Sequence, residues 1–205
     1  MYIDLGFLRI FISFSFTVFF AVLCVLSKDI SFIFAFLSAL FHEAVHLLFL
    51  FKFGCKKASM ELFPGGIKIK ADGFLLMPCK KAVCILLSAP VFNIIAGAAF
   101  FVLGSAFLSE LLLRISAVNL ILGVFNLLPL PFLDGGMALS QFLENKYPEN
   151  KAGRICEIFA VTALLLMTAL FFVLFTKVDL SLSAVIFLVY CFIGCFNDKR
   201  GGGIT

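Results

Sequence analysis

The chain alternates between long apolar runs and short polar breaks, and these runs give the first prediction of its fold. Six stretches are apolar enough and long enough to be membrane-spanning helices, because such a helix needs about 20 consecutive apolar residues. They cover residues 5–27, 30–53, 82–108, 111–130, 155–176 and 179–196. The pattern predicts an all-α polytopic membrane protein with six transmembrane helices.

One break between the apolar runs has a different pattern. Residues 54–81 contain "ELFPGG" followed by "IKIKA", where apolar and polar residues alternate around a Pro-Gly-Gly turn. Alternation of period two around such a turn is typical of short extended strands. An ordinary basic surface loop is the alternative. The only long polar linker is 141–154, so we expect residues 1–205 to form a single membrane domain.

Composition excludes a soluble globular protein. Hydrophobic residues make up 63% of the chain and charged residues only 14%, whereas soluble domains carry about 25% charged residues. The natural solvent of this chain is therefore a lipid bilayer.

The basic residues favour one orientation in that bilayer. With six spans, 13 of the 16 lysines and arginines fall on the side that holds both termini. Cytoplasmic loops are enriched in such residues, so both termini are predicted to be cytoplasmic. The net charge of +4 then reflects topology, and we predict no nucleic-acid partner.

The second apolar run contains the stretch "FHEAVHLL", which holds both histidines of the chain. His42 and His46 are four residues apart, so on a helix they project from one face and can bind the same metal ion. H-E-x-x-H is the zinc-binding pattern of metalloproteases, in which the glutamate, here Glu43, is the general base. Ionisable groups inside a membrane are costly, which favours a functional over a purely structural reading.

A catalytic zinc site needs three protein ligands, and the chain has no third histidine. Asp134 is the best-placed carboxylate, because it follows the segment 126–133, "NLLPLPFL", and precedes Gly135 and Gly136. The prolines interrupt a helix and the glycines permit close backbone approach, so a carboxylate can turn inward. The alternative is an aspartate that caps the following helix, and the residues alone leave the two readings open.

Together, "HEAVH" and "NLLPLPFLDGG" resemble the site-2 protease family of intramembrane zinc metalloproteases. The family pattern N-x-x-P-x-x-x-L-D-G is matched by Asn126, Pro129, Leu133, Asp134 and Gly135. The resemblance implies a three-helix catalytic core within about residues 30–145. It also implies one zinc ion bound by both histidines and Asp134.

Three further roles follow from the resemblance. The asparagine of "SAPVFN", Asn93, is expected near the active site, where it holds substrate or stabilises an oxyanion. The strand segment 59–72 resembles a membrane-associated loop that engages extended substrates. Gly65 and Gly66 are therefore predicted to contact substrate, as is Asn126.

The short layout is most similar to the branch that contains stage IV sporulation protein FB, which processes a membrane-tethered sigma factor precursor. Within residues 1–205 we expect neither the CBS domain of that branch nor a PDZ insertion. The resemblance implies a prokaryotic inner membrane location, a membrane-embedded or membrane-tethered protein substrate, and an inhibitory membrane protein as a further class of partner.

Two functions of different classes explain the same residues. The first is an intramembrane zinc endopeptidase, in which Glu43 activates water. The second is a zinc transporter or a non-catalytic zinc-binding membrane scaffold. A transporter needs several exchangeable ligands along a path, whereas the predicted ligands here gather at one depth, so we favour the endopeptidase.

Overall fold

The computed structural model describes residues 2–26, 31–63, 66–175 and 195. The chain forms two compact units, residues 1–125 and 126–203. The prediction of a single membrane domain stays a prediction.

The first unit contains four strands and most of the helices. Its elements are β1 (Tyr2–Asp4), β2 (Leu8–Ile12), α1 (Phe14–Leu26), α2 (Ser31–Lys52), β3 (Ala58–Phe63), β4 (Gly66–Ala71), the 3-10 turn η1 (Phe74–Leu76), α3 (Cys79–Ala106) and α4 (Glu110–Asn126). Helix α2 packs on α3, while α1 contacts β3 and α2 contacts β4. The second unit contains α5 (Asp134–Glu144) and α6 (Glu149–Phe175), which pack on each other.

The predicted hairpin between the second and third apolar runs is confirmed. Strands β3 and β4 pair antiparallel, with Phe63 opposite Gly66 at the turn. The sheet has four strands in the order β1-β2-β3-β4, and β2 pairs parallel to β3. A location of this sheet at the membrane surface stays a prediction.

The prediction of one helix over residues 5–27 is wrong in its first part, because Leu8–Ile12 form strand β2. Side chains along β2 alternate between half-buried and exposed, which is the two-residue period of a strand. Arg9 pairs with Asp4, with 3.2 Å between its Nε and a carboxylate oxygen. The backbone of β2 forms strand hydrogen bonds with β3. The two-residue period is hard to detect in the sequence because nearly all residues of this stretch are apolar.

Three described helices are long and apolar enough to cross a membrane. They cover Phe32–Lys52, Cys79–Ala106 and Glu149–Val173. The predicted span 111–130 corresponds to α4 but ends at Asn126, since Pro129 and Pro131 follow and lack the N–H that a helix needs. The predicted span 179–196 lies outside the described residues, apart from position 195. The number of six transmembrane helices therefore stays a prediction.

Helices α3 and α4 approach each other closely at three glycines. A methyl group on Gly97 would lie 2.7 Å from the side chain of Leu120, and one on Gly104 would lie 2.9 Å from that of Leu113. A methyl on Gly123 would lie 2.8 Å from the Pro90 carbonyl oxygen. Small residues of this kind let helix backbones approach in a membrane, where packing drives association.

Candidate metal centre

The two histidines lie one turn apart on the buried face of α2. His42 and His46 are 4% and 7% exposed, and their ring centroids are 4.9 Å apart. Lys52 ends this helix, six residues after His46 and ten after His42. At about 1.5 Å per residue, the two imidazoles lie roughly 9 and 15 Å along the axis from that charged end. They are therefore at membrane depth if α2 spans the bilayer.

A backbone carbonyl of α3 orients His46. Its Nδ1 lies 3.0 Å from the carbonyl oxygen of Ile85, which is fully buried. Because a carbonyl can only accept, Nδ1 must carry the proton, and Nε2 is left as the metal donor. A metal-binding histidine almost always donates its other N–H in this way, which fixes the tautomer and the ring orientation.

The sequence around Asp134 builds a tight turn before α5. Leu133 is the residue before the helix, with an extended backbone, and Asp134 begins it. A methyl group on Gly135 would collide with the carbonyl of Leu127, and one on Gly136 with the carbonyl of Leu130. Only glycine allows the first turn of α5 to lie against the backbone of residues 127–130. Asp134 is buried, at 8% exposed.

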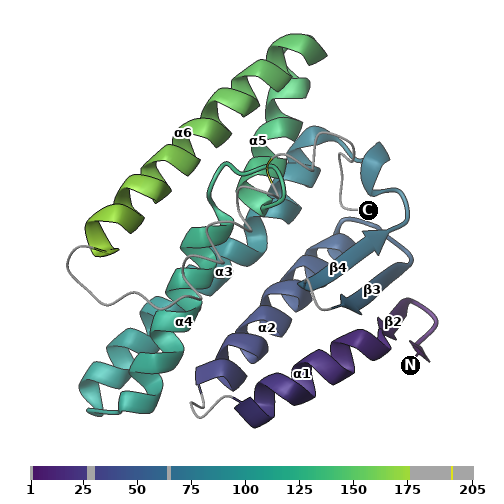
Figure 1. The fold of residues 1–205 in the computed structure, drawn as a ribbon. Helices are drawn as coiled ribbons and strands as arrows, with labels where there is room; N and C mark the ends of the chain where they lie inside the picture. Colours follow the sequence, from purple (N-terminus) through teal and green to yellow (C-terminus); the bar gives the residue numbers. More distant parts are fainter. Residues whose placement is uncertain (1, 27–30, 64–65, 176–194, 196–205) are drawn as a thin grey trace. The chain divides into compact units, whose positions relative to one another are not determined.

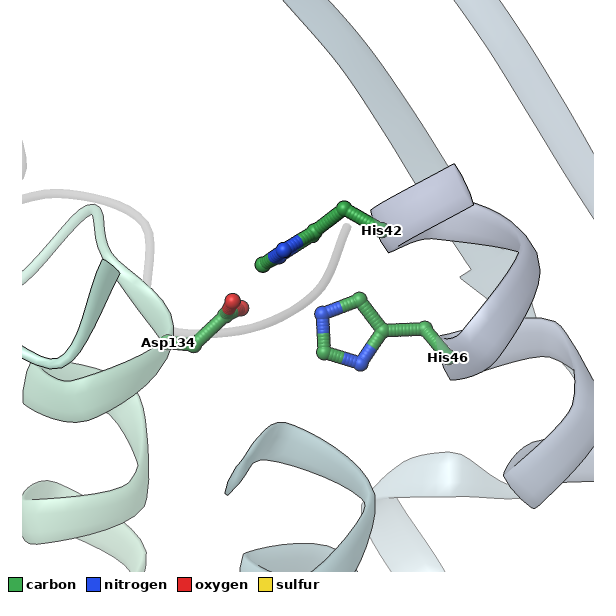
Figure 2. Close-up of side chains that lie close together, drawn as sticks. All are labelled: His42, His46 and Asp134. Carbon is green, nitrogen blue, oxygen red and sulfur yellow. The ribbon is translucent and has the colours of Figure 1, made fainter. Parts of the chain in front are cut away.

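Two observations bear on whether Asp134 binds a metal or caps α5, the two interpretations that the residues alone leave open. Its carboxylate lies in the first turn of α5, where the helix dipole stabilises negative charge. No side chain caps this helix at Leu133. The metal-binding atoms of His42, His46 and Asp134 lie within 4.8 Å of one another, and Figure 2 shows the three side chains. In the described part of the chain, this is the one group of three such residues.

The chemistry of these donors fits zinc. Two imidazoles and one carboxylate form a known set for catalytic zinc, which keeps a fourth position for water or substrate. The hydrogen bond from His46 to Ile85 leaves the correct nitrogen for such a site. Glu43 is half-buried and lies next to His42 in sequence on α2.

The remaining predicted residues lie in different surroundings. Asn93 is fully buried in α3 and donates from Nδ2 to Oδ1 of Asn119, at 3.2 Å. Asn126 is the half-buried last residue of α4, and Gly66 begins β4 with a φ of +136°. Gly65 lies outside the described residues.

Sequence reasoning missed three groups that surround these residues: the Ile85 carbonyl, Asn119 and Ser38. A backbone carbonyl leaves no mark on the sequence. Asn119 and Ser38 are visible as polar residues within apolar runs, but neither belongs to a motif as Asn93 does.

Three comparisons show which known proteins this chain is similar to. The model of peptidase family M50 matches residues 104–169, a stretch that includes Asp134 but not the histidines. A zinc metalloprotease of Methanocaldococcus jannaschii is 27% identical over 175 residues, which are 82% of this chain and 49% of that protein. The chain thus spans about half the length of this curated relative.

The solved structure of a site-2 protease from Methanocaldococcus jannaschii superimposes with a TM-score of 0.67. The match covers 100% of this chain and 97% of that one, at 23% sequence identity. The chain has the site-2 protease fold. The chain is thus similar in part of its sequence to peptidase family M50 and to a zinc metalloprotease, and in its fold to a site-2 protease.

Proposed function

We propose that this protein is an intramembrane zinc endopeptidase. The observation that carries the proposal is the buried group of His42, His46 and Asp134, whose histidines lie on a helix long enough to cross a membrane. Burial of three such groups in apolar surroundings is costly unless they are paired or hold a metal. One zinc ion satisfies all three at once.

Each residue then has a separate task. His42 and Asp134 supply one ligand atom each, and His46 supplies Nε2 while its Nδ1–H donates to the Ile85 carbonyl oxygen. Bound zinc would supply the Lewis acidity that makes water a nucleophile near neutral pH. Glu43 accepts the proton of the attacking water and passes it to the leaving amine.

The substrate class follows from the depth of the histidines. A protease at this depth acts on peptide bonds within or next to a membrane-embedded segment. Such a segment is helical, with its backbone hydrogen bonds made internally, so it must open locally before hydrolysis. Strand β4, beginning at Gly66, has one edge that pairs with no other described strand, and this edge is suited to pair with an opened segment. Gly65 and Asn126 are proposed as further substrate contacts.

The choice of a first substrate rests on the resemblance to the branch of stage IV sporulation protein FB. We therefore propose a membrane-tethered sigma factor precursor as the substrate class to test first. A prokaryotic cell membrane with both termini in the cytoplasm belongs to the same proposal, as does control by an inhibitory membrane protein.

The decisive experiment measures zinc content and precursor cleavage for wild type and Glu43→Gln. Glu43→Gln removes the base but no ligand, so we expect zinc to be retained and cleavage to fall by about 100-fold or more. Glu110→Gln is the matched control, because Glu110 is exposed in the first turn of α4. It should cleave like wild type.

Two results would contradict the proposal. One is equal cleavage by Glu43→Gln and wild type. The other is zinc flux in proteoliposomes that does not depend on Glu43, which would favour the transporter.

A further inference from the structure

A buried polar network links the three helices α2, α3 and α4. Asn119 donates from Nδ2 to the Ser38 hydroxyl, at 3.0 Å, and to the carbonyl oxygen of Ile115, at 2.9 Å. Its Oδ1 accepts a hydrogen bond from Nδ2 of Asn93, at 3.2 Å. Ser38, Asn93 and Asn119 are 6%, 0% and 4% exposed. One side chain from each helix therefore meets in an apolar interior.

The network determines which way the amide of Asn93 faces. The Ile115 carbonyl can only accept, so the amino end of Asn119 must face it, and the Asn119 oxygen is then directed at Asn93. Asn93 must therefore donate to this oxygen from its amino group. Its Oδ1 is left over: this oxygen is buried and has no hydrogen-bond partner among the described residues. The network thus presents an acceptor that lacks a donor.

This acceptor lies near the level of the histidines along the helices. Ser38 is four residues before His42 on α2, which is one turn, or about 6 Å along the axis. Asn93 is eight residues after Ile85, and Ser38 is eight residues before His46, which bonds to Ile85. The network therefore lies about two turns from the His46–Ile85 hydrogen bond and one turn from His42.

Stability alone does not explain such an arrangement. A buried acceptor without a donor lowers stability, whereas apolar side chains of the same shape would fill the space at no such cost. Each buried polar atom left unpaired in a folded protein calls for a reason. A donor that arrives during the reaction would be one.

We propose that Asn119 and Ser38 are positioning residues that hold the Asn93 carbonyl ready to accept a hydrogen bond during catalysis. The donor is either a peptide N–H of the opened substrate or a water molecule on its way to the metal centre. An opened segment exposes N–H groups that find no partner in hydrocarbon, and Asn93 offers one. This inference rests on the proposed function; the sequence led us to expect that Asn93 holds substrate or stabilises an oxyanion, and the inference adds an accepting role for its carbonyl and a positioning role for Asn119 and Ser38.

The test is the double variant Asn93→Leu/Asn119→Leu, which replaces both amides with apolar side chains of similar size. We expect an unchanged or higher Tm and unchanged zinc content. We also expect kcat/KM for a membrane-tethered precursor to fall by about 100-fold, the cost of losing correct substrate placement. A loss mainly in KM identifies the substrate N–H as the donor, and a loss mainly in kcat identifies water.

Ser116→Ala is the matched control. Ser116 is buried in the seam between α3 and α4 and donates to the Gly97 carbonyl, at 2.7 Å. The variant therefore loses a hydrogen bond between these two helices without altering the Asn93 amide. It should retain cleavage even if its Tm falls.

Two outcomes would overturn the inference. Unchanged cleavage by the double variant means that the acceptor has no part in the reaction. A joint fall in Tm, zinc content and cleavage means that the network only supports the fold. Glu43→Gln is assayed in parallel and tests the proposed function separately. The Tm and zinc content of the double variant do not depend on cleavage, so a failure of the inference can be distinguished from a failure of the proposed function.

Discussion

At the scale of single residues, the two glycines after Asp134 tolerate substitution as little as we expect of the carboxylate itself. Gly135 and Gly136 face the carbonyls of Leu127 and Leu130, where any β-carbon would collide with backbone. Backbone cannot rotate away as a long side chain can. The first turn of α5, which Asp134 begins, can therefore lie where it does only because neither glycine carries a β-carbon.

We predict that Gly136→Ala displaces the first turn of α5, weakens zinc binding and lowers the Tm. Gly153→Ala is the control, since a methyl group there meets nothing within 4 Å. Because glycine is about 1 kcal/mol less favourable than alanine within a helix, that change should be neutral or stabilising. Zinc titration and thermal unfolding measure both effects. Equal zinc affinity in the two variants would refute the collision argument.

Removal of the Asp134 carboxylate, the proposed third ligand, should affect zinc binding more strongly than the fold. We predict that Asp134→Ala binds zinc at least 100-fold more weakly than wild type, since loss of an outer contact alone typically costs about 10–100-fold. Asp72→Asn, in the exposed turn after β4, is the control and should bind zinc as wild type does. Zinc retained through dialysis by Asp134→Ala would remove Asp134 from the ligand set.

The sequence indicated which three side chains come together in the candidate metal centre, but not what surrounds them. His42 and His46 were identifiable from residue type and spacing, and Asp134 from the family resemblance; their ligand atoms lie within 4.8 Å of one another. Their partners follow a different logic. The hydrogen-bond acceptor for His46 is a backbone carbonyl, and the role of Asn119 depends on which helices meet, which no local pattern reveals.

At the scale of elements, turn residues were a reliable guide and apolar content was not. Pro-Gly-Gly between two alternating stretches predicted β3 and β4 correctly. Strand β2 was missed because its pairing partner, β3, lies some fifty residues further along the chain. Membrane helices and short buried strands are equally apolar, so composition cannot separate them. Only the exposure pattern of Leu8–Ile12 does so.

The seam between α3 and α4 gives a prediction at this scale. Gly123→Ala would place a methyl group 2.8 Å from the Pro90 carbonyl oxygen, within the backbone of the neighbouring helix. Overpacking of this kind typically costs about 1–3 kcal/mol. We expect a lower Tm, whereas Val124→Ala, at a site where the side chain is 57% exposed, should have little effect. Thermal unfolding in one detergent compares the two, and equal Tm values would contradict a tight seam.

At the scale of the whole molecule, the distribution of charge predicts the orientation in the membrane. The turn that holds Asp72 is expected in the cytoplasm, and Phe107, after the end of α3, on the opposite side. Asp72 and Phe107 are both exposed, so cysteines placed there are accessible to labelling. Among the native cysteines, Cys55 is expected to react slowly, because burial, followed by the nearby Asp72 charge, raises the pKa of its thiol.

We predict that a membrane-impermeant thiol reagent labels Asp72→Cys from the cytoplasmic face and Phe107→Cys from the other face. Inverted vesicles and intact cells provide the two faces, and the parent protein corrects for native cysteines. Labelling of both positions from the same face would refute the topology. That result would not affect the proposed metal centre, because the site does not depend on which face of the membrane is cytoplasmic.

The hydrogen bond between His46 and the Ile85 carbonyl has a consequence for how this protein tolerates change. Any amino acid at position 85 carries the same carbonyl, so a survey of all substitutions there would report only the size and shape that the core accepts. The contact that orients the His46 ring would go unnoticed in such a survey. It becomes visible only when the backbone is altered, for example by an amide-to-ester exchange or by a shift of α3 along its axis.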